Sequence, residues 1–93
     1  MVDQVKICGI PYKVILKEDE FDTDAHFGQI DYVKSEIKIN AALSNEMKEE
    51  ALTHEILHGI FIHLGFNDES QNERFVQSLA NAINQTFTLR KEV

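Results

Sequence analysis

The spacing of the apolar residues changes once along the chain, near residue 43, and this change limits the fold to strands followed by helices. Before that point apolar and polar residues alternate, as at Tyr12 and Val14, which is the period of a half-buried strand. After it apolar residues recur every four positions, as at Phe75, Leu79 and Ile83, which is the period of an amphipathic helix. The sequence therefore predicts an α+β fold: a small, mostly antiparallel sheet of three or four strands, followed by two helices.

The predicted strands lie between about residues 4 and 40. A shift in the alternation at residues 9–11 indicates a bulge or a tight turn between two short strands. The segments HFGQIDY and EIKIN alternate on either side of residues 33–35 and predict a hairpin. The acidic segment 18–25, EDEFDTDA, has no period and is expected to be a loop.

The first predicted helix covers residues 44–65, and the second covers residues 69–89. Ser44 or Asn45 can cap the first helix, and Gly65 is placed to end it. The second is expected to begin near Asp68 to Ser70. A chain of 93 residues with 43% hydrophobic residues has room for one compact core, so residues 1–93 are expected to form a single domain.

Charge and composition argue against several classes of function. The net charge is −7, and the nine Lys and Arg residues are scattered along the chain, which argues against nucleic acid and anionic membranes as partners. No secretory leader and no apolar run of about 20 residues is present, so a soluble, cytoplasmic protein is expected. The single cysteine, Cys8, is expected to be a small hydrophobic residue of a strand. Nothing in the sequence specifies an oligomeric state.

The stretch HEILH, residues 54–58, carries the main functional signal. On a helix His54 and His58 lie one turn apart and about 40° from each other, so both imidazoles can reach one zinc ion. Glu55 lies close enough to contact a water on that ion without binding the metal. The alternative is a pair of helical histidines without a metal, but apolar residues at positions 51, 57 and 61 place the pair on the apolar face, where unpartnered imidazoles would be destabilising.

His63 is an unsuitable third ligand. One class of zinc peptidases has the pattern HExxHxxGxxH, in which the third histidine follows the second by six positions, whereas His63 follows His58 by five. If the helix continues to Gly65, His63 points about 180° from His54. A histidine at a helix C-terminus, favourable with the helix dipole, is the simpler interpretation.

The remaining candidates are carboxylates near the start of the second helix. Glu73 is favoured because apolar residues follow it at three and seven positions, and catalytic zinc commonly uses two histidines and a glutamate. The alternative is that Ser70 and Glu73 form a capping box, S-x-x-E, without a metal. Glu69 is the second choice as a ligand, and Asp68 is expected to cap the helix.

The segments HEILHGIFIHLGF and NERFVQSLANAI together resemble the active-site helix and glutamate helix of small gluzincin-type zinc metallopeptidases. Within that group the chain is most similar to the ImmA/IrrE-like proteins of phages and mobile elements and to the minigluzincins, over about residues 28–88. The resemblance implies a minimal zincin-like metallopeptidase domain with one Zn²⁺, His54, His58 and Glu73 as metal ligands, and Glu55 as general base. It also implies a peptide or protein substrate aligned along an edge strand, which would here consist of Glu36, Ile37, Lys38, Ile39 and Asn40.

A site of this composition predicts peptide-bond hydrolysis by a zinc-activated water, with Glu55 as the catalytic base. A further donor would stabilise the oxyanion, and His26, Tyr32 and Tyr12 are the candidates. Hydrogen-bond partners are expected for the zinc-binding imidazoles, with Asn72 and Gln77 as candidates.

Three functions remain open on the sequence. The first is an active zinc endopeptidase, acting for example on a phage repressor. The second is a zinc-bound but latent or inactive protein-binding module of phage or prophage origin, with residues 89–93 lying across the site as the tails of minigluzincin zymogens do. The third is a binding module with structural histidines. An intact HExxH motif favours the first, because a structural zinc site does not need a general base.

Overall fold

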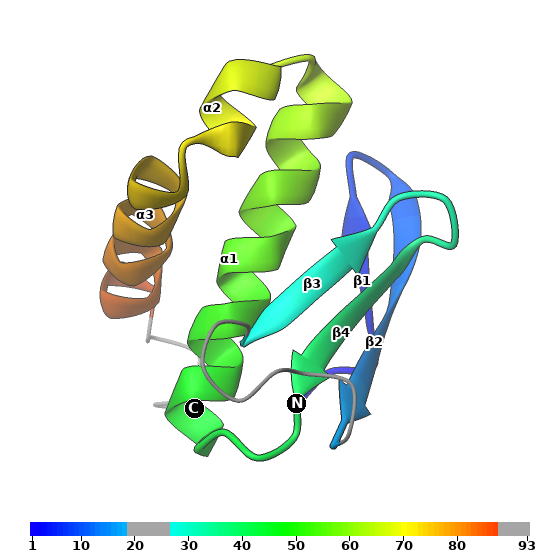
Figure 1. Ribbon diagram of the computed structural model, residues 1–93, viewed down its shortest axis with the longest axis vertical. Coiled ribbons are helices and arrows are strands. Elements are labelled where there is room, and N and C mark those ends of the chain that lie inside the picture. Colours follow the sequence, from blue (N-terminus) through cyan, green and yellow to red (C-terminus); the bar gives the residue numbers. More distant parts are fainter. Residues whose placement is uncertain (19–26, 88–93) are drawn as a thin grey trace.

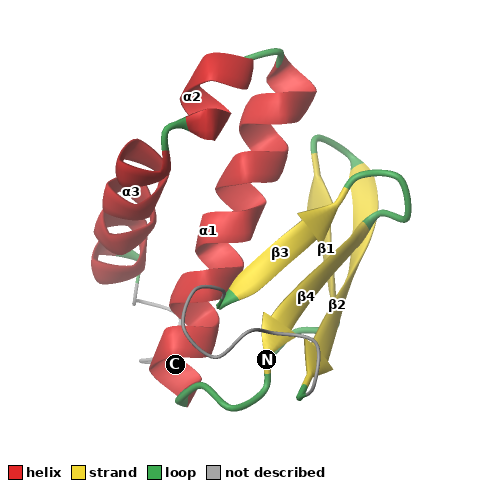
Figure 2. Ribbon diagram, viewed as in Figure 1, coloured by secondary structure: helices red, strands yellow, loops and turns green. Residues whose placement is uncertain are grey.

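In the computed structural model, which describes residues 1–18 and 27–87, a long helix lies between a sheet and two further helices (Figure 1). Figure 2 shows the same arrangement by secondary structure, with the strands on one side of the central helix and the shorter helices on the other. The elements, in chain order, are β1 (Gln4–Ile7), β2 (Ile10–Lys17), β3 (Gly28–Asp31), β4 (Glu36–Asn40), α1 (Asn45–Leu64), α2 (Asn67–Gln71) and α3 (Glu73–Thr86).

The four strands form one mixed sheet in the order β1-β2-β4-β3. The β1/β2 and β3/β4 pairs are antiparallel, which confirms the predicted hairpin, but β2 and β4 run parallel. The α+β class is therefore confirmed, with a sheet that is not purely antiparallel. The prediction that Glu36–Asn40 is an edge strand is wrong, because β4 bonds to β2 on one side and to β3 on the other. The edge strands are β1 and β3.

A two-residue turn joins β1 to β2, and this confirms the tight turn predicted near residue 9. Ile7 pairs with Ile10, and the two residues between them, Cys8 and Gly9, have φ angles of 50° and 84°. Two consecutive positive φ angles give the turn a twist that matches the twist of the strands. Cys8 is exposed in this turn, so its predicted place as a strand hydrophobe is wrong.

Helix α1 begins and ends where the sequence predicts. The side chain of Ser44 accepts a hydrogen bond from the backbone N–H of Met47, which otherwise has no partner within the helix. Gly65 ends the helix at φ 86°, and its N–H donates to the carbonyl of Ile62. A left-handed residue at this place is the common way to end a helix, and glycine adopts it without strain.

The second predicted helix is divided in two at Asn72. Asn72 ends α2 and caps α3, since its side chain accepts a hydrogen bond from the N–H of Phe75. The alternative of a capping box is therefore wrong: Ser70 lies inside α2 and is buried, and Glu73 is the first residue of α3. Asp68 does not cap a helix either, because α2 begins one residue before it.

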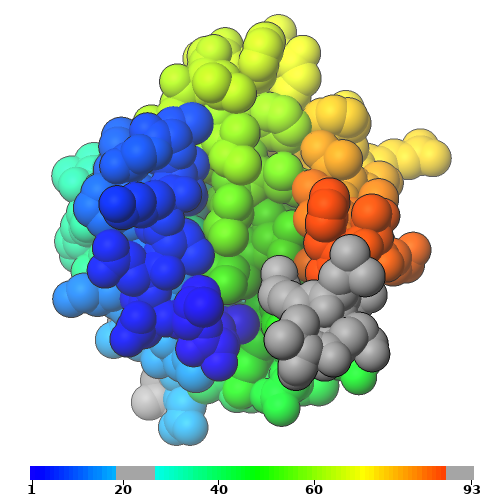
Figure 3. All heavy atoms as spheres, turned by 180° about the vertical axis from the view of Figure 1, so that it is seen from behind, coloured from blue at the N-terminus to red at the C-terminus, as the bar shows by residue number. Residues whose placement is uncertain are grey.

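The core has two parts, one on each side of α1. On the sheet side, the strands and α1 bury a cluster made of Ile7, Tyr12, Val14, Ile37, Ile39, Ala51 and Leu52. On the other side α1 packs against α3 through a smaller cluster of Leu57, Val76 and Ala80. Seen from behind, α1 remains visible between the N-terminal strands and α3 (Figure 3). One helix thus connects both halves of the core.

The side of the sheet that faces away from α1 gathers basic residues that are scattered in the sequence. Strand alternation places Lys6, Lys13, Lys17 and Lys38 on this side, because their neighbours Ile7, Tyr12, Val14, Ile37 and Ile39 point into the core. The expectation of no nucleic-acid partner therefore depends on the net charge alone. No helix among the described residues is long and apolar enough to cross a membrane.

Candidate metal centre

Helices α1 and α3 bring His54, His58 and Glu73 together. His54 Nε2 lies 3.1 Å from His58 Nε2 and 3.0 Å from Glu73 Oε2. His58 Nε2 lies 2.8 Å from Glu73 Oε1. These three side chains form a group that could hold a metal ion. The histidines are half-buried on α1, whereas the Glu73 side chain is 68% exposed.

The spacing of these atoms fits a zinc ion with little movement. Two ligand atoms at zinc bond lengths near 2.0–2.1 Å and a tetrahedral angle lie about 3.3 Å apart. The distances of 2.8–3.1 Å within the group are a few tenths of an ångström shorter. Two imidazoles and a carboxylate are also the ligand set of many catalytic zinc sites. The residues present therefore fit the metal that the sequence predicts.

The other ring nitrogen of each histidine has its own partner. His54 Nδ1 lies 2.8 Å from Gln77 Oε1, and His58 Nδ1 lies 3.1 Å from Ser70 Oγ. Such contacts orient an imidazole so that its remaining nitrogen faces the metal. Gln77 was a predicted partner, and the structure confirms the contact. Asn72, the other candidate, instead caps α3.

Glu55 lies in the same cleft, and its side chain is almost fully buried, at 7% exposure. Burial raises the pKa of the Glu55 carboxyl to about 7, and the negative charge of Glu73 adds to the rise. Burial lowers the pKa of His58, and His54 adds to that effect while Glu73 opposes it. A carboxylate with a pKa near neutrality is suited to accept and return a proton.

Gly28 allows β3 to approach Glu55 closely. A Cβ atom on Gly28 would lie 3.0 Å from Ile39 Cδ1 and 3.3 Å from Glu55 Cγ. A side chain there would press on the core and on the carboxylate together. The edge strand therefore forms the wall of the cleft through its backbone at this point.

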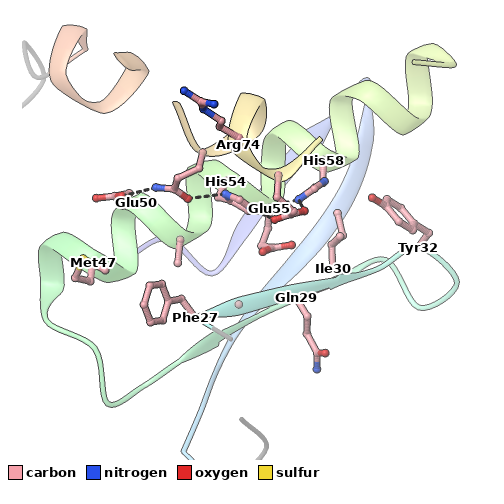
Figure 4. Close-up of a pocket in the computed structure, with 14 residues that line it drawn as sticks. Phe27, Gln29, Ile30, Tyr32, Met47, Glu50, His54, Glu55, His58 and Arg74 are labelled. Carbon is pink, nitrogen blue, oxygen red and sulfur yellow. Dashed lines mark hydrogen bonds and ion pairs between the residues drawn. The ribbon is translucent and has the colours of Figure 1, made fainter. Parts of the chain in front are cut away.

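The cleft has a volume of about 830 Å³, and His54, His58 and Glu73 are among the residues that line it. Figure 4 shows Phe27 and Met47 toward one end and Tyr32 at the other, while Gln29 points away to the far side of β3. The lining is contributed by β3 and its approach, by α1 and by the first turns of α3. The predicted substrate strand β4 contributes no residue to it.

Of the remaining candidate residues among those that the structure describes, only Tyr32 lies in the cleft. His63 is exposed in the last turn of α1, and its Nε2 lies 2.7 Å from the hydroxyl of the fully buried Tyr12. Neither residue lines the cleft. Tyr32 does line it, and burial followed by the charge of Glu55 raises its pKa, whereas a hydrogen bond with Ser70 opposes the rise. His26 and the tail 89–93 lie outside the described residues.

Sequence reasoning missed Ser70, Glu50 and Asn81. Ser70 contacts His58 only because the chain turns back after α1, and no spacing in the sequence indicates that contact. Glu50 and Asn81 contact Gln77, with Glu50 one turn before His54 and Asn81 one turn after Gln77. This four-residue spacing on two helices is a signal that the sequence does contain.

Comparison of the chain with protein-family models, curated proteins and solved structures finds no match.

Proposed function

We propose that this protein is a zinc-dependent metallopeptidase of the gluzincin type, with a zincin-like fold, that hydrolyses peptide bonds. The observation that carries the proposal is the meeting of His54 Nε2, His58 Nε2 and the Glu73 carboxylate beside the buried Glu55 in one open cleft. The three ligating groups come from two different helices. Their convergence with a general base in the same cleft is the arrangement that hydrolysis requires.

When bound, zinc supplies a Lewis acid that polarises the peptide carbonyl and lowers the pKa of a water molecule toward about 7. Among the described residues, three protein groups converge on the site and would hold the ion, so this set of donors would leave room for a water molecule on it. Glu55 accepts a proton from that water and passes it to the departing amine. The Tyr32 hydroxyl, in the same cleft, is the donor assigned to the developing oxyanion.

The substrate is proposed to be an extended peptide that pairs with β3. The free edge of this strand borders the cleft, and residues 27–30 line it in sequence. Peptides commonly bind by adding a strand to an exposed sheet edge, with backbone hydrogen bonds that do not depend on sequence. We therefore propose Gly28–Asp31, in place of Glu36–Asn40, as the strand that aligns the substrate. A cytoplasmic location and a phage or mobile-element context remain expectations from the sequence.

Metal content and peptide hydrolysis, measured together, test this function. The wild type is expected to bind about one zinc ion per chain and to cleave members of a peptide library. Glu73→Ala should weaken zinc binding, whereas Glu69→Ala, a matched loss of a carboxylate from the exposed face of α2, should not. Glu55→Ala should keep the zinc and lose hydrolysis.

Two outcomes would contradict the proposal. Equal zinc affinity in Glu73→Ala and Glu69→Ala would mean that Glu73 only pairs with the histidines as an ion-pair partner. A wild type that binds zinc but cleaves no peptide in a broad library would favour the alternative of a latent or inactive protein-binding module. The two assays therefore separate the metal site from the activity.

A further inference from the structure

The side-chain amide of Gln77 bridges α1 and α3 behind the candidate metal centre. Its oxygen lies 2.8 Å from His54 Nδ1, and its nitrogen donates to Glu50 Oε1 at 2.5 Å and to Asn81 Oδ1 at 3.0 Å. Dashed bonds in Figure 4 mark the path from Glu50 through this amide to His54. Both polar atoms of the amide therefore have partners. The contacts with Glu50 and His54 join α3 to α1, and the contact with Asn81 lies within α3.

Glu50 determines which way the amide of Gln77 faces. An ionised carboxylate only accepts hydrogen bonds, so the NH₂ group of Gln77 must point toward it. The oxygen of Gln77 then faces His54 and can only accept. His54 must therefore present N–H at Nδ1, which in a neutral imidazole leaves the lone pair at Nε2, the atom that faces His58 and Glu73.

The partner of His58 does not impose a comparable choice. Ser70 Oγ lies 3.1 Å from His58 Nδ1 and donates to the carbonyl of His58 at 3.4 Å. While it donates to that carbonyl the hydroxyl can only accept from Nδ1, but this contact is long, and the hydroxyl can instead rotate and donate to Nδ1. No charged group among the described residues is shown to orient Ser70. The two histidines are thus held by different means.

We propose that Gln77 is a positioning residue that holds His54 in its metal-binding tautomer, and that Glu50 acts through Gln77 by fixing the direction of the amide. The proposal rests on the metal site proposed above but not on peptidase activity. Because the partner of a ligating histidine commonly contributes 10- to 100-fold to metal affinity, Gln77 is assigned a share of that size.

The first test compares zinc affinities by competition with a chelator. Gln77→Met keeps the length of the side chain and removes all three hydrogen bonds, so it is expected to weaken zinc binding by about 10- to 100-fold. Gln85→Met, the same exchange at an exposed position of α3, is the control and should bind zinc as the wild type does. Circular dichroism of the zinc-free proteins verifies that both variants fold.

An exchange of the two partners gives a sharper test. Gln77→Glu places two carboxylates in contact and should weaken zinc binding strongly. The double variant Glu50→Gln/Gln77→Glu restores the hydrogen bond between these two residues with its direction reversed. The amide at residue 50 then donates to the carboxylate at residue 77, and this carboxylate still accepts from His54. It is expected to recover most of the affinity lost in Gln77→Glu. A packing role alone predicts additive losses in the double variant.

Imidazole ¹⁵N NMR of the zinc-loaded proteins provides the direct readout. The Nδ1–H proton of His54 should be visible and slow to exchange in the wild type and in the double variant, and should be lost to exchange in Gln77→Met. Equal zinc affinity in Gln77→Met and Gln85→Met, or no recovery in the double variant, would overturn this proposal and leave the metal site intact. A wild type that binds no zinc would overturn both.

Discussion

Gly59 of α1 lies so close to Ile7 of β1 that a Cβ atom on Gly59 would stand 2.8 Å from Ile7 Cδ1. Ile7 is 1% exposed and cannot move away freely. Gly59 follows His58 of the candidate metal site directly, so this contact affects how closely α1 approaches the sheet there. Added volume at such a site forces side chains and backbone to shift.

Gly59→Ala is therefore expected to destabilise the fold by about 1–3 kcal/mol, despite the higher helix propensity of alanine. Denaturant unfolding of the zinc-free protein measures the change. In an Ile7→Val background, which lacks the Cδ1 atom, the same exchange should be less destabilising. An equal loss in both backgrounds would mean that the contact with Ile7 is not the cause.

Zinc should stabilise the folded protein through the proposed ligands. A ligand present at about 100 times its dissociation constant adds about 2.7 kcal/mol to the unfolding free energy, so the thermal midpoint of the wild type should rise with zinc and fall again with a chelator. His54→Ala and His58→Ala should lose this response. His63→Ala is the matched control, because His63 pairs with Tyr12 outside the cleft, and it should retain the zinc response even if its baseline stability falls.

The buried Glu55 predicts a pH-dependent penalty in the zinc-free protein. Its pKa is raised from 4.5 to about 7 on folding, so the folded state binds more protons than the unfolded state between these values. Stability contributed by this group is complete below about pH 4.5 and falls as pH rises to about 7, by an amount on the order of 3 kcal/mol.

Glu55→Gln removes this carboxylate with little change in volume. Above pH 7 the zinc-free variant should be more stable than the wild type, and the two should converge toward pH 4.5. The lowered pKa of His58 destabilises the folded state at low pH. Because this effect is present in both proteins, it cancels when they are compared. Denaturant unfolding from pH 4.5 to 8.5 measures the difference, and parallel curves would contradict the assigned burial effect.

Tyr32→Phe tests the oxyanion donor. If the Tyr32 hydroxyl stabilises charge only in the transition state, kcat should fall by about 10²-fold or more while KM and zinc affinity change little. Tyr12→Phe removes the other tyrosine hydroxyl, which contacts His63, and should leave kcat unchanged. A rise in KM with unchanged kcat would instead mean that Tyr32 contacts the substrate equally in the ground state and the transition state.

The ends of α1 and the turn between β1 and β2 could be predicted from the sequence because short-range interactions determine them. The cap at Ser44, the left-handed Gly65 and the turn after Ile7 each depend on a few adjacent residues. The pairing of strands does not: β4 lies inside the sheet because β2 runs parallel to it, and the alternation of apolar residues is the same for an edge and an interior strand. Glu36–Asn40 was therefore wrongly predicted to be an edge strand.

The grouping of His54, His58 and Glu73 was predictable for a similar reason, and the surroundings of this candidate metal site were not. Helical spacing alone brings His54 and His58 together and turns His63 away. The approach of Glu73 and Gln77 to His54 is consistent with a second amphipathic helix packed on the first. The contact of Ser70 with His58 was not predicted, because the break at Asn72 depends on the turn that follows α1, and this turn is a tertiary feature.

Because the chain breaks at Asn72, three residues with different roles lie within the four positions 70–73. Ser70 contacts His58, Asn72 caps α3, and Glu73 reaches the two histidines of the candidate metal site. One residue added to α3 ahead of Glu73 would rotate that carboxylate by about 100° relative to the cap, away from both histidines. Within this segment the exposed Gln71 should accept substitutions, but an insertion or deletion would separate Glu73 from both histidines and abolish the candidate metal site while leaving both parts of the core in place.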